Sequence, residues 1–173
     1  MADHCARRAT LRALASVVLL ACSAATSAEA VHARVVKVFD GDTLAIIDGS
    51  NRQFKVRLTG IDAPERGQRY SGTARKSLVE LTQSRTVLVE YHKVDRYGRL
   101  VGKVSVDGRD VSVEQLRRGL AWHRASIPHD QSHQEAFLYG QAESEARSRR
   151  LGLWQENAVP PWKFREANKG GPQ

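Results

Sequence analysis

The sequence predicts an α+β fold, a five-stranded β-barrel of the Greek-key OB type with three helices. Three observations support this prediction. Five short segments rich in β-branched residues are separated by tight turns, a helical segment follows the third of them, and helical periodicity returns after the fifth. The chain has 173 residues, of which 41% are hydrophobic and 27% charged. This composition is typical of one globular domain and argues against a disordered chain or a polytopic membrane protein.

The first three predicted strands form a meander. They are expected at 31–38, 44–47 and 54–58, joined by tight turns. In the third strand, apolar residues alternate with Lys55 and Arg57. Because successive side chains of a strand point to opposite faces of the sheet, we expect both cations on the face that points away from the core.

The middle of the chain changes its hydrophobic period. Ala74, Leu78 and Leu81 recur at helical spacing and predict a helix over 69–83. Apolar and β-branched residues then return in two runs, separated by a turn that contains a glycine. These runs complete the set of five strands, at 86–91 and 100–106.

Two further helices are expected in the C-terminal third. The shorter one covers 112–118, with Ser112 and Gln115 as a capping box. The longer one covers 131–149 and starts from Asp130, whose side chain is suited to a helix N-cap. Two adjacent prolines that follow are expected to interrupt regular structure.

The first thirty residues have the order of a secretory signal. Three arginines precede an apolar run at 13–21, and small residues follow it. The run is shorter than the roughly 20 residues that a membrane-spanning helix needs. We expect cleavage after Ala28 or Ala30 and a secreted or periplasmic protein; the alternative is an outer-membrane lipoprotein lipidated at Cys22. The predicted organisation is a signal at 1–30, a barrel domain at 31–165 and a flexible tail at 166–173.

The charge of the chain predicts an anionic partner. Lys and Arg number 27 against 19 Asp and Glu, which gives a formal net charge of +8. Nucleic acid and an acidic membrane surface both fit such a charge. Both cysteines, Cys5 and Cys22, fall within the predicted signal, so we expect no disulfide, thiol nucleophile or cysteine-based zinc site in the working domain.

Three short clusters contain the acidic and basic residues that are candidates for chemistry. Each has a plain structural explanation when taken alone: 40–43 as a turn, 62–65 as a helix N-cap, and 95–99 as a hairpin connection. Taken together, they contain two carboxylates, Asp42 and Asp62, of the kind that a hard divalent cation prefers as ligands.

The same clusters contain groups that suit a phosphodiester. The guanidinium groups of Arg57 and Arg99 match phosphate oxygens bidentately, which a lysine does not. Glu65 offers a carboxylate near the candidate metal ligands, where it is able to position or deprotonate a water molecule. A metal, a charge clamp and a base are the parts that phosphodiester cleavage requires.

These residues resemble the thermonuclease, or staphylococcal nuclease-like, family. The resemblance extends over about 31–154. It rests on five ordered motifs: DGDT at 40–43, Arg57 followed by DAPE at 62–65, DRYGR at 95–99, LRRGLA at 116–121 and GLW at 152–154. It implies an OB-fold barrel with three helices and a calcium-dependent nuclease that cleaves DNA and RNA and leaves 3′-phosphate ends.

The resemblance also implies a metal site. Asp42 and Asp62 correspond to the carboxylates that bind Ca²⁺, and the backbone carbonyl of Ala63 to the third protein ligand. The family usually has threonine at this third position, but a carbonyl ligand does not depend on the side chain. Asp40 corresponds to an acid beside the metal ligands, and Thr43 to a supporting hydroxyl.

The remaining site residues are implied in the same way. Glu65 corresponds to the general base, and Arg57 and Arg99 to the residues that neutralise the phosphate. Three residues are candidates for nucleotide contact: Arg96, Tyr97 and Trp122. Arg96 stands where well-known members have a lysine. For Trp122, stacking on a base and packing into the core are equally open.

Two alternatives to a nuclease remain open at this stage. One is an OB-fold module that binds nucleic acid and has lost catalysis; the complete set of candidate catalytic residues argues against it. The other is an envelope lipoprotein, which rests on Cys22 and the net charge alone. We expect a monomer that acts on DNA and RNA, without an obligate protein partner, and that contacts a membrane only if Cys22 is lipidated.

Overall fold

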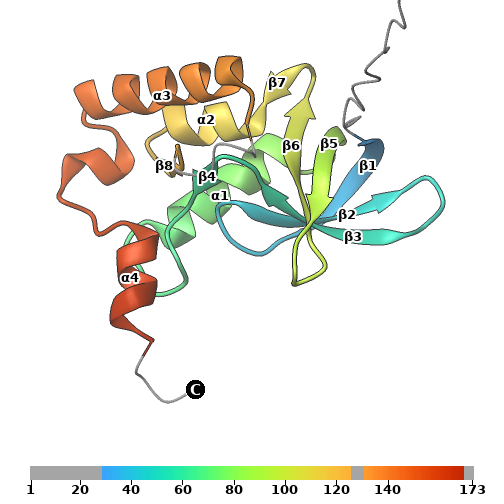
Figure 1. Ribbon diagram of the computed structural model, residues 1–173, viewed down its shortest axis with the longest axis horizontal. Coiled ribbons are helices and arrows are strands. Elements are labelled where there is room, and N and C mark those ends of the chain that lie inside the picture. Colours follow the sequence, from blue (N-terminus) through green and yellow to red (C-terminus); the bar gives the residue numbers. More distant parts are fainter. Residues whose placement is uncertain (1–28, 126–130, 170–173) are drawn as a thin grey trace, which may run out of the picture.

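The barrel domain contains five main strands. Figure 1 shows the computed structural model, which describes residues 29–125 and 131–169. The predicted signal residues 1–28, with Cys22 among them, and Asp130 lie outside the described residues. The main strands are β1 (Glu29–Val38), β2 (Thr43–Asp48), β3 (Gln53–Leu58), β5 (Thr86–Val94) and β6 (Leu100–Val106).

These strands close on themselves. Their order is β3-β2-β1-β5-β6, and consecutive neighbours in that order are antiparallel. A parallel pairing of β3 with β6, in which Arg57 lies opposite Val101, closes the barrel. Closure pairs the two strands that would otherwise be exposed edges. The predicted five-stranded OB-type barrel is therefore confirmed, with strand boundaries shifted by a few residues.

Three further strands are only two residues long. β4 (Ile61–Asp62) and β8 (Trp122–His123) form a separate two-stranded sheet, and β7 (Arg109–Asp110) pairs with β6 and extends the main sheet. The β4–β8 pairing sets Asp62 opposite Trp122. This pairing ties the segment that follows β3 to the segment that precedes the long C-terminal helix.

The three predicted helices are present. They are α1 (Ser71–Thr82), α2 (Val111–Arg117) and α3 (His133–Ser148), and Figure 1 shows α3 running along α2. A 3₁₀ turn, η1 (Gly152–Gln155), ends the α3 region. Among the described residues, no helix has both the length and the apolar character that crossing a bilayer would require.

A fourth helix, α4 (Pro161–Ala167), lies where the sequence predicted an interruption and the start of a tail. Pro160 is extended and Pro161 occupies the first turn of the helix. Proline suits this position because the first backbone N–H groups of a helix have no partner within the helix. The two prolines thus start a helix instead of ending regular structure, and α4 projects away from the other helices in Figure 1.

The predicted caps of two helices are wrong. Asp110, not Ser112, caps α2, because its side chain accepts a hydrogen bond of 2.7 Å from the backbone N–H of Ser112. Gln115 is fully buried and takes no part in a cap. In α3 the N-cap is Ser132, which forms a capping box with Glu135.

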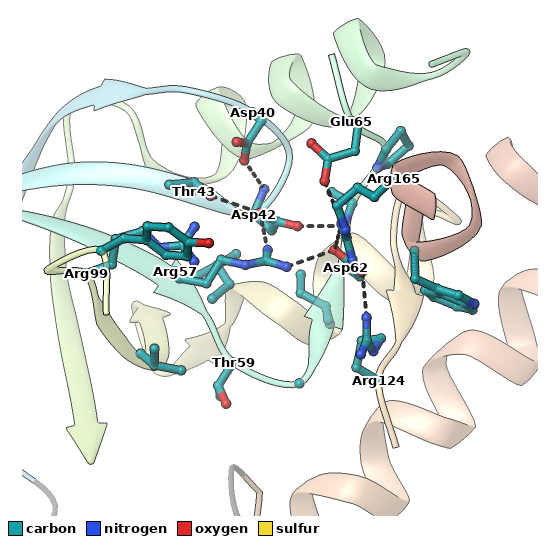
Figure 2. Close-up of a pocket in the computed structure, with 18 of the residues that line it drawn as sticks. Asp40, Asp42, Thr43, Arg57, Thr59, Asp62, Glu65, Arg99, Arg124 and Arg165 are labelled. Atoms are coloured by element: carbon teal, nitrogen blue, oxygen red, sulfur yellow. Dashed lines mark hydrogen bonds and ion pairs between the residues drawn. The ribbon is translucent and has the colours of Figure 1, made fainter. Parts of the chain in front are cut away.

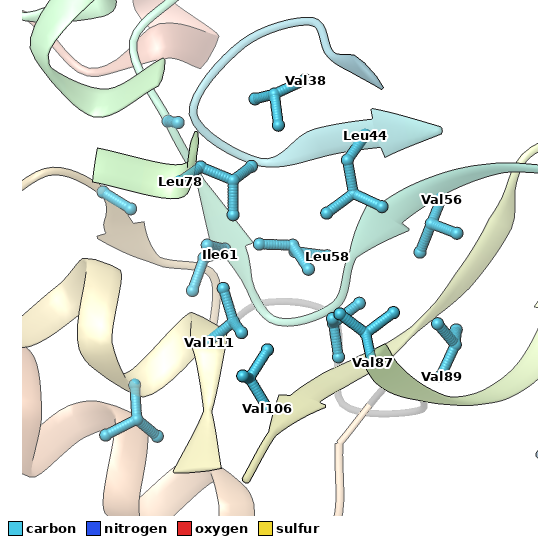
Figure 3. Packing of buried hydrophobic residues seen from close by; sticks show 14 of the residues in the cluster. Val38, Leu44, Val56, Leu58, Ile61, Leu78, Val87, Val89, Val106 and Val111 are labelled. Atoms are coloured by element: carbon cyan, nitrogen blue, oxygen red, sulfur yellow. The ribbon is translucent and has the colours of Figure 1, made fainter. Parts of the chain in front are cut away.

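The hydrophobic core fills the barrel and the space between the barrel and the helices. Figure 3 shows part of it, with side chains from β2, β3 and β5 meeting those of α1 and α2. Its largest fully buried aliphatic side chains include Leu44, Ile46, Leu58, Leu78 and Leu116. Removing such apolar area from water supplies most of the stability of a domain without disulfides. A rigid barrel of this kind holds the loops at its rim in fixed positions.

Candidate active site

Most of the candidate residues line one cavity at the rim of the barrel. It has a volume of about 690 Å³ and is bounded by the turn between β1 and β2, the end of β3, the β5–β6 connection and α4. Five carboxylates from different segments line it: Asp40, Asp42, Asp62, Glu65 and Glu166. Five guanidinium groups face the same space: Arg57, Arg96, Arg99, Arg124 and Arg165. Figure 2 shows several of these groups pointing toward one another.

The 40–43 turn approaches its neighbours very closely. A Cβ atom at Gly41 would lie 2.6 Å from the Cβ of Ala74 and 2.7 Å from the Cβ of Ala63, so only glycine fits there. The buried amide of Gln115 donates a hydrogen bond of 2.7 Å to the Gly41 carbonyl. Contacts with Ala74 of α1 and Gln115 of α2 therefore fix the position of the turn.

The carboxylate of Asp42 is held at both oxygens. Thr43 Oγ1 donates to Asp42 Oδ1 at 3.0 Å, and the backbone N–H of Ala63 donates to Asp42 Oδ2 at 2.6 Å. Asp40 in turn accepts a hydrogen bond of 3.0 Å from the backbone N–H of Asp42. Burial raises the pKa of Asp40, while the hydroxyl of Thr43 and the charge of Arg57 oppose this shift.

Arg57 bridges the two buried aspartates. Its guanidinium pairs with Asp42 and, at 2.9 Å, with Asp62 Oδ1. Arg57 projects from the outer face of β3, as the strand alternation predicts. Burial lowers the pKa of Arg57, and the charges of Asp62 and Asp40 oppose this shift. Arginine keeps its proton in proteins, so the group remains a fixed positive charge.

Asp62 is surrounded by three arginines. Besides Arg57, it pairs with Arg165 at 2.8 Å and with Arg124 at 2.9 Å, and only 2% of its side chain is exposed. Burial by itself would raise the pKa of Asp62. The hydrogen bonds and charges of the three arginines outweigh burial and hold the pKa of Asp62 below its ordinary value.

Glu65 lies at the open side of the cavity. Its carboxylate pairs with Arg165 at 2.5 Å, and the two side chains are 40% and 41% exposed. The backbone N–H of Glu65 donates to the side chain of Gln68 at 2.7 Å, and Gln68 donates to the carbonyl of Val159 at 2.9 Å. This chain of contacts connects the turn that carries Glu65 to the segment before α4.

Arg99 and Tyr97 form the opposite wall of the cavity. Arg99 donates to Asp95 Oδ2 at 2.7 Å, which fixes one side of its guanidinium, and lies 5.3 Å from the centre of the Tyr97 ring. Arg96 donates to the Tyr97 hydroxyl at 2.8 Å. The Tyr97 side chain is 67% exposed, so its ring is accessible to a base.

Trp122 is the one predicted site residue that does not line the cavity. It is 3% exposed, and its ring meets Trp154 and Trp162 edge to face at centroid distances of 5.8 and 6.3 Å. A base cannot stack on a ring that the protein interior covers. The predicted contact of Trp122 with substrate is therefore wrong, and the alternative of core packing holds.

Two arginines at the cavity were not predicted from the sequence. Arg124 follows β8, and Arg165 is on α4, about 100 residues along the chain from the carboxylates that it pairs with. Neither belongs to a motif of the resemblance. The short β4–β8 pairing and helix α4, which bring them to Asp62, have no clear signal in the sequence.

The donor chemistry of the cavity fits a hard divalent cation. Asp42 and Asp62 present carboxylate oxygens on either side of Arg57, whose positive charge now balances them. Within the described residues, no three side chains of His, Cys, Asp or Glu group tightly enough to hold an ion by themselves. An ion bound here would thus complete its shell with main-chain oxygen, water or substrate, as hard cations commonly do.

Comparison with known proteins identifies the class of protein. The family model for staphylococcal nuclease homologues matches residues 55–156, which is more than half of the chain. The chain belongs to this family, and the resemblance inferred from its motifs is confirmed. The OB-type barrel with a charged cavity at its rim is the structure of a nuclease, an enzyme of the hydrolase class.

Individual relatives cover most of the chain. A micrococcal nuclease of Shigella flexneri is 38% identical over 172 residues, which cover 93% of this chain and 95% of the relative. An uncharacterized endonuclease of Escherichia coli O157:H7 is 38% identical over 137 residues, which cover 78% of this chain and 85% of the relative. The staphylococcal-like nuclease CAN1 of Arabidopsis thaliana is 36% identical over 121 residues, which cover 69% of this chain and 36% of the relative. The names of these relatives support the assignment of this chain as an endonuclease.

Proposed function

We propose that this protein is a calcium-dependent endonuclease that hydrolyses phosphodiester bonds in DNA and RNA and leaves 3′-phosphate ends. One observation supports the proposal most strongly. A single cavity brings together buried carboxylates suited to a divalent cation, a more exposed carboxylate, and arginines from separate strands and loops. That combination suits a polyanion whose phosphate gains charge during cleavage.

The metal site in this proposal consists of three groups. The carboxylates of Asp42 and Asp62 and the backbone carbonyl of Ala63 would hold Ca²⁺, and the hydrogen bond from Ala63 to Asp42 already holds two of the three residues together. Asp40 and Thr43 support them by orienting Asp42. A divalent cation held there would supply Lewis-acid chemistry, polarising a phosphate oxygen and lowering the pKa of a water molecule.

The chain's own residues supply the remaining steps. Arg57 and Arg99 bind the non-bridging oxygens of the phosphate and stabilise the negative charge that develops on them. Glu65 accepts a proton from the attacking water. The water oxygen bonds to phosphorus, the bond from phosphorus to the 5′ oxygen breaks, and the departing 5′ oxygen takes up a proton from solvent to become a hydroxyl, so that the phosphate stays on the 3′ side. Arg96 and Tyr97 contact the neighbouring nucleotide.

Removal of calcium tests the proposal directly. The purified domain is expected to degrade both DNA and RNA with Ca²⁺ and to lose this activity with a chelator, because the paired carboxylates then lack their cation. The product ends are expected to block extension by a polymerase until a phosphatase has removed the 3′-phosphate. Binding of nucleic acid without cleavage in any divalent metal would contradict the proposal and favour a catalytically silent OB-fold module.

Replacing Arg165 by alanine tests the metal site without relying on activity. Arg165 places a positive charge against Asp62 and Glu65, where it competes with a divalent cation. We expect Arg165→Ala to bind Ca²⁺ about tenfold more tightly in calorimetry, a change of about 1.4 kcal/mol. Lys163→Ala, which removes an exposed charge from the same helix, is the matched control. Unchanged or weaker binding by Arg165→Ala would contradict this placement of the ion.

A further inference from the structure

A second hollow adjoins the active-site cavity. It has a volume of about 370 Å³ and shares Asp40 with the larger cavity, so the two meet at the 40–43 turn. Lys37, Phe39, Arg66 and Arg75 line it. The ammonium of Lys55 lies 4.5 Å from the centre of the Phe39 ring and that of Lys37 lies 5.0 Å from it. We call these five residues the basic groove.

Strand register places the basic groove directly beside Arg57. Lys37 on β1 and Lys55 on β3 both lie opposite Ala45 on β2, so they form one row across three strands. Arg57 lies opposite Thr43 in the next row on the same face, two residues further along β3. Two residues of a strand span about 6.6 Å. This distance is comparable to the step between successive phosphates of an extended nucleic-acid strand.

The cations of the groove form no direct ion pair among the described residues, although the carboxylate of Asp40, which also lines the hollow, acts on Lys55 through its charge. Around the active-site cavity, Arg99, Arg124 and Arg165 each pair with a carboxylate. By contrast, no ion pair joins a groove cation to any acidic side chain of residues 29–125 and 131–169. Arg75 donates only to the carbonyl of Val38, at 3.1 Å, and the two lysines lie over Phe39.

Binding of an anion would make this arrangement more favourable. Two ammonium groups within about 5 Å of one aromatic ring repel each other, and cation–π contact with Phe39 offsets only part of that repulsion. Lys37, Arg66 and Arg75 are exposed, so a ligand can reach them from solvent. A polyanion that already has one phosphate at Arg57 would bring the next phosphate to this surface.

We propose that the basic groove binds the phosphates next to the one that is cleaved, and so makes long nucleic-acid strands better substrates than a single dinucleotide. The inference rests on the proposed function of the neighbouring cavity. Lys37 and Lys55 contact the first flanking phosphate, and Arg66 and Arg75 contact the strand as it leaves the cavity. The ring of Phe39 holds the two ammonium groups in position.

The test is a double variant, Lys37→Ala with Lys55→Ala, assayed on a long oligonucleotide and on a dinucleotide that has one phosphodiester bond. We expect kcat/KM on the long strand to fall about tenfold, since counterion release makes each phosphate contact contribute to affinity. We expect kcat/KM on the dinucleotide to stay the same, because it has no flanking phosphate. The matched control is Arg34→Ala with Arg109→Ala, which removes two exposed cations from β1 and β7 outside both hollows.

Binding of the long oligonucleotide in a chelator gives a second readout that does not need cleavage. The slope of log affinity against log salt is expected to fall by about 0.7 for each phosphate that the double variant no longer binds. Equal losses on both substrates, an unchanged long-strand rate, or equal losses in the control variant would each overturn the inference. If the wild type cleaves nothing, the proposed function fails, while the salt slope still decides whether the groove binds phosphates.

Discussion

Replacing Arg57 by alanine is expected to lower kcat on DNA by about 10³-fold or more, equivalent to about 4 kcal/mol of transition-state stabilisation. The reason is the position of the guanidinium. It lies between the carboxylates of Asp42 and Asp62, at the point where a phosphate oxygen would approach a bound cation. A positive charge at this point stabilises the transition state more than the ground state, because negative charge develops on the phosphate during cleavage.

The same substitution has a second effect, on stability. Arg57 is largely buried, and its loss leaves two buried carboxylates with less compensating charge. Breaking a buried pair in this way costs about 3 kcal/mol or more. Calcium bound at the carboxylates would replace the missing charge. We therefore expect the Tm of Arg57→Ala to rise more with added calcium than the Tm of the wild type.

Arg57→Lys separates the two effects. It keeps a positive charge near the aspartates but lacks the planar fork that binds two phosphate oxygens at once. We expect it to recover much of the stability and little of the activity. A lysine variant with wild-type kcat would show that charge alone suffices, and an alanine variant with wild-type kcat would remove Arg57 from the mechanism.

Glu65→Gln is expected to lower kcat by about 10² to 10⁴-fold, because an amide cannot accept the proton of the attacking water. The fold should be almost unaffected. Glu65 and its partner Arg165 are both about 40% exposed, and an ion pair this accessible to solvent contributes at most about 1 kcal/mol. The measurement is kcat at saturating calcium together with thermal unfolding, and a low kcat with an unchanged Tm is the expected combination.

The matched control for this variant is Glu166→Gln. Glu166 also lines the cavity and is exposed, but it lies on α4 and forms no ion pair with an arginine that contacts Asp62. We expect its kcat to stay near the wild-type value. If both glutamine variants lost activity equally, the loss would reflect the overall charge of the cavity, and the assignment of Glu65 as the base would be wrong.

Much of the fold was predictable because it depends on local patterns. The alternation around Lys55 and Arg57 marks β3 and sets Arg57 on its outer face, since the side-chain period of a strand is two. The helical spacing of Ala74 and Leu78 marks α1, and both residues are fully buried. The caps were harder to predict. Ser112 and Gln115 fit a local capping pattern, but Asp110 caps α2, and tertiary contacts engage Gln115 with the 40–43 turn.

The sequence alone predicted the five strands, the three main helices, the family and the short motifs that line the cavity, because each of these signals depends on residues close together in the chain. The secretory signal remains a prediction of the sequence. Only the tertiary structure decided that Trp122 is covered, that Arg124 and Arg165 meet Asp62, and that Lys37 and Lys55 share a row beside Arg57. Those contacts join segments distant in the chain, and their geometry arises only when the barrel closes and α4 packs at its rim.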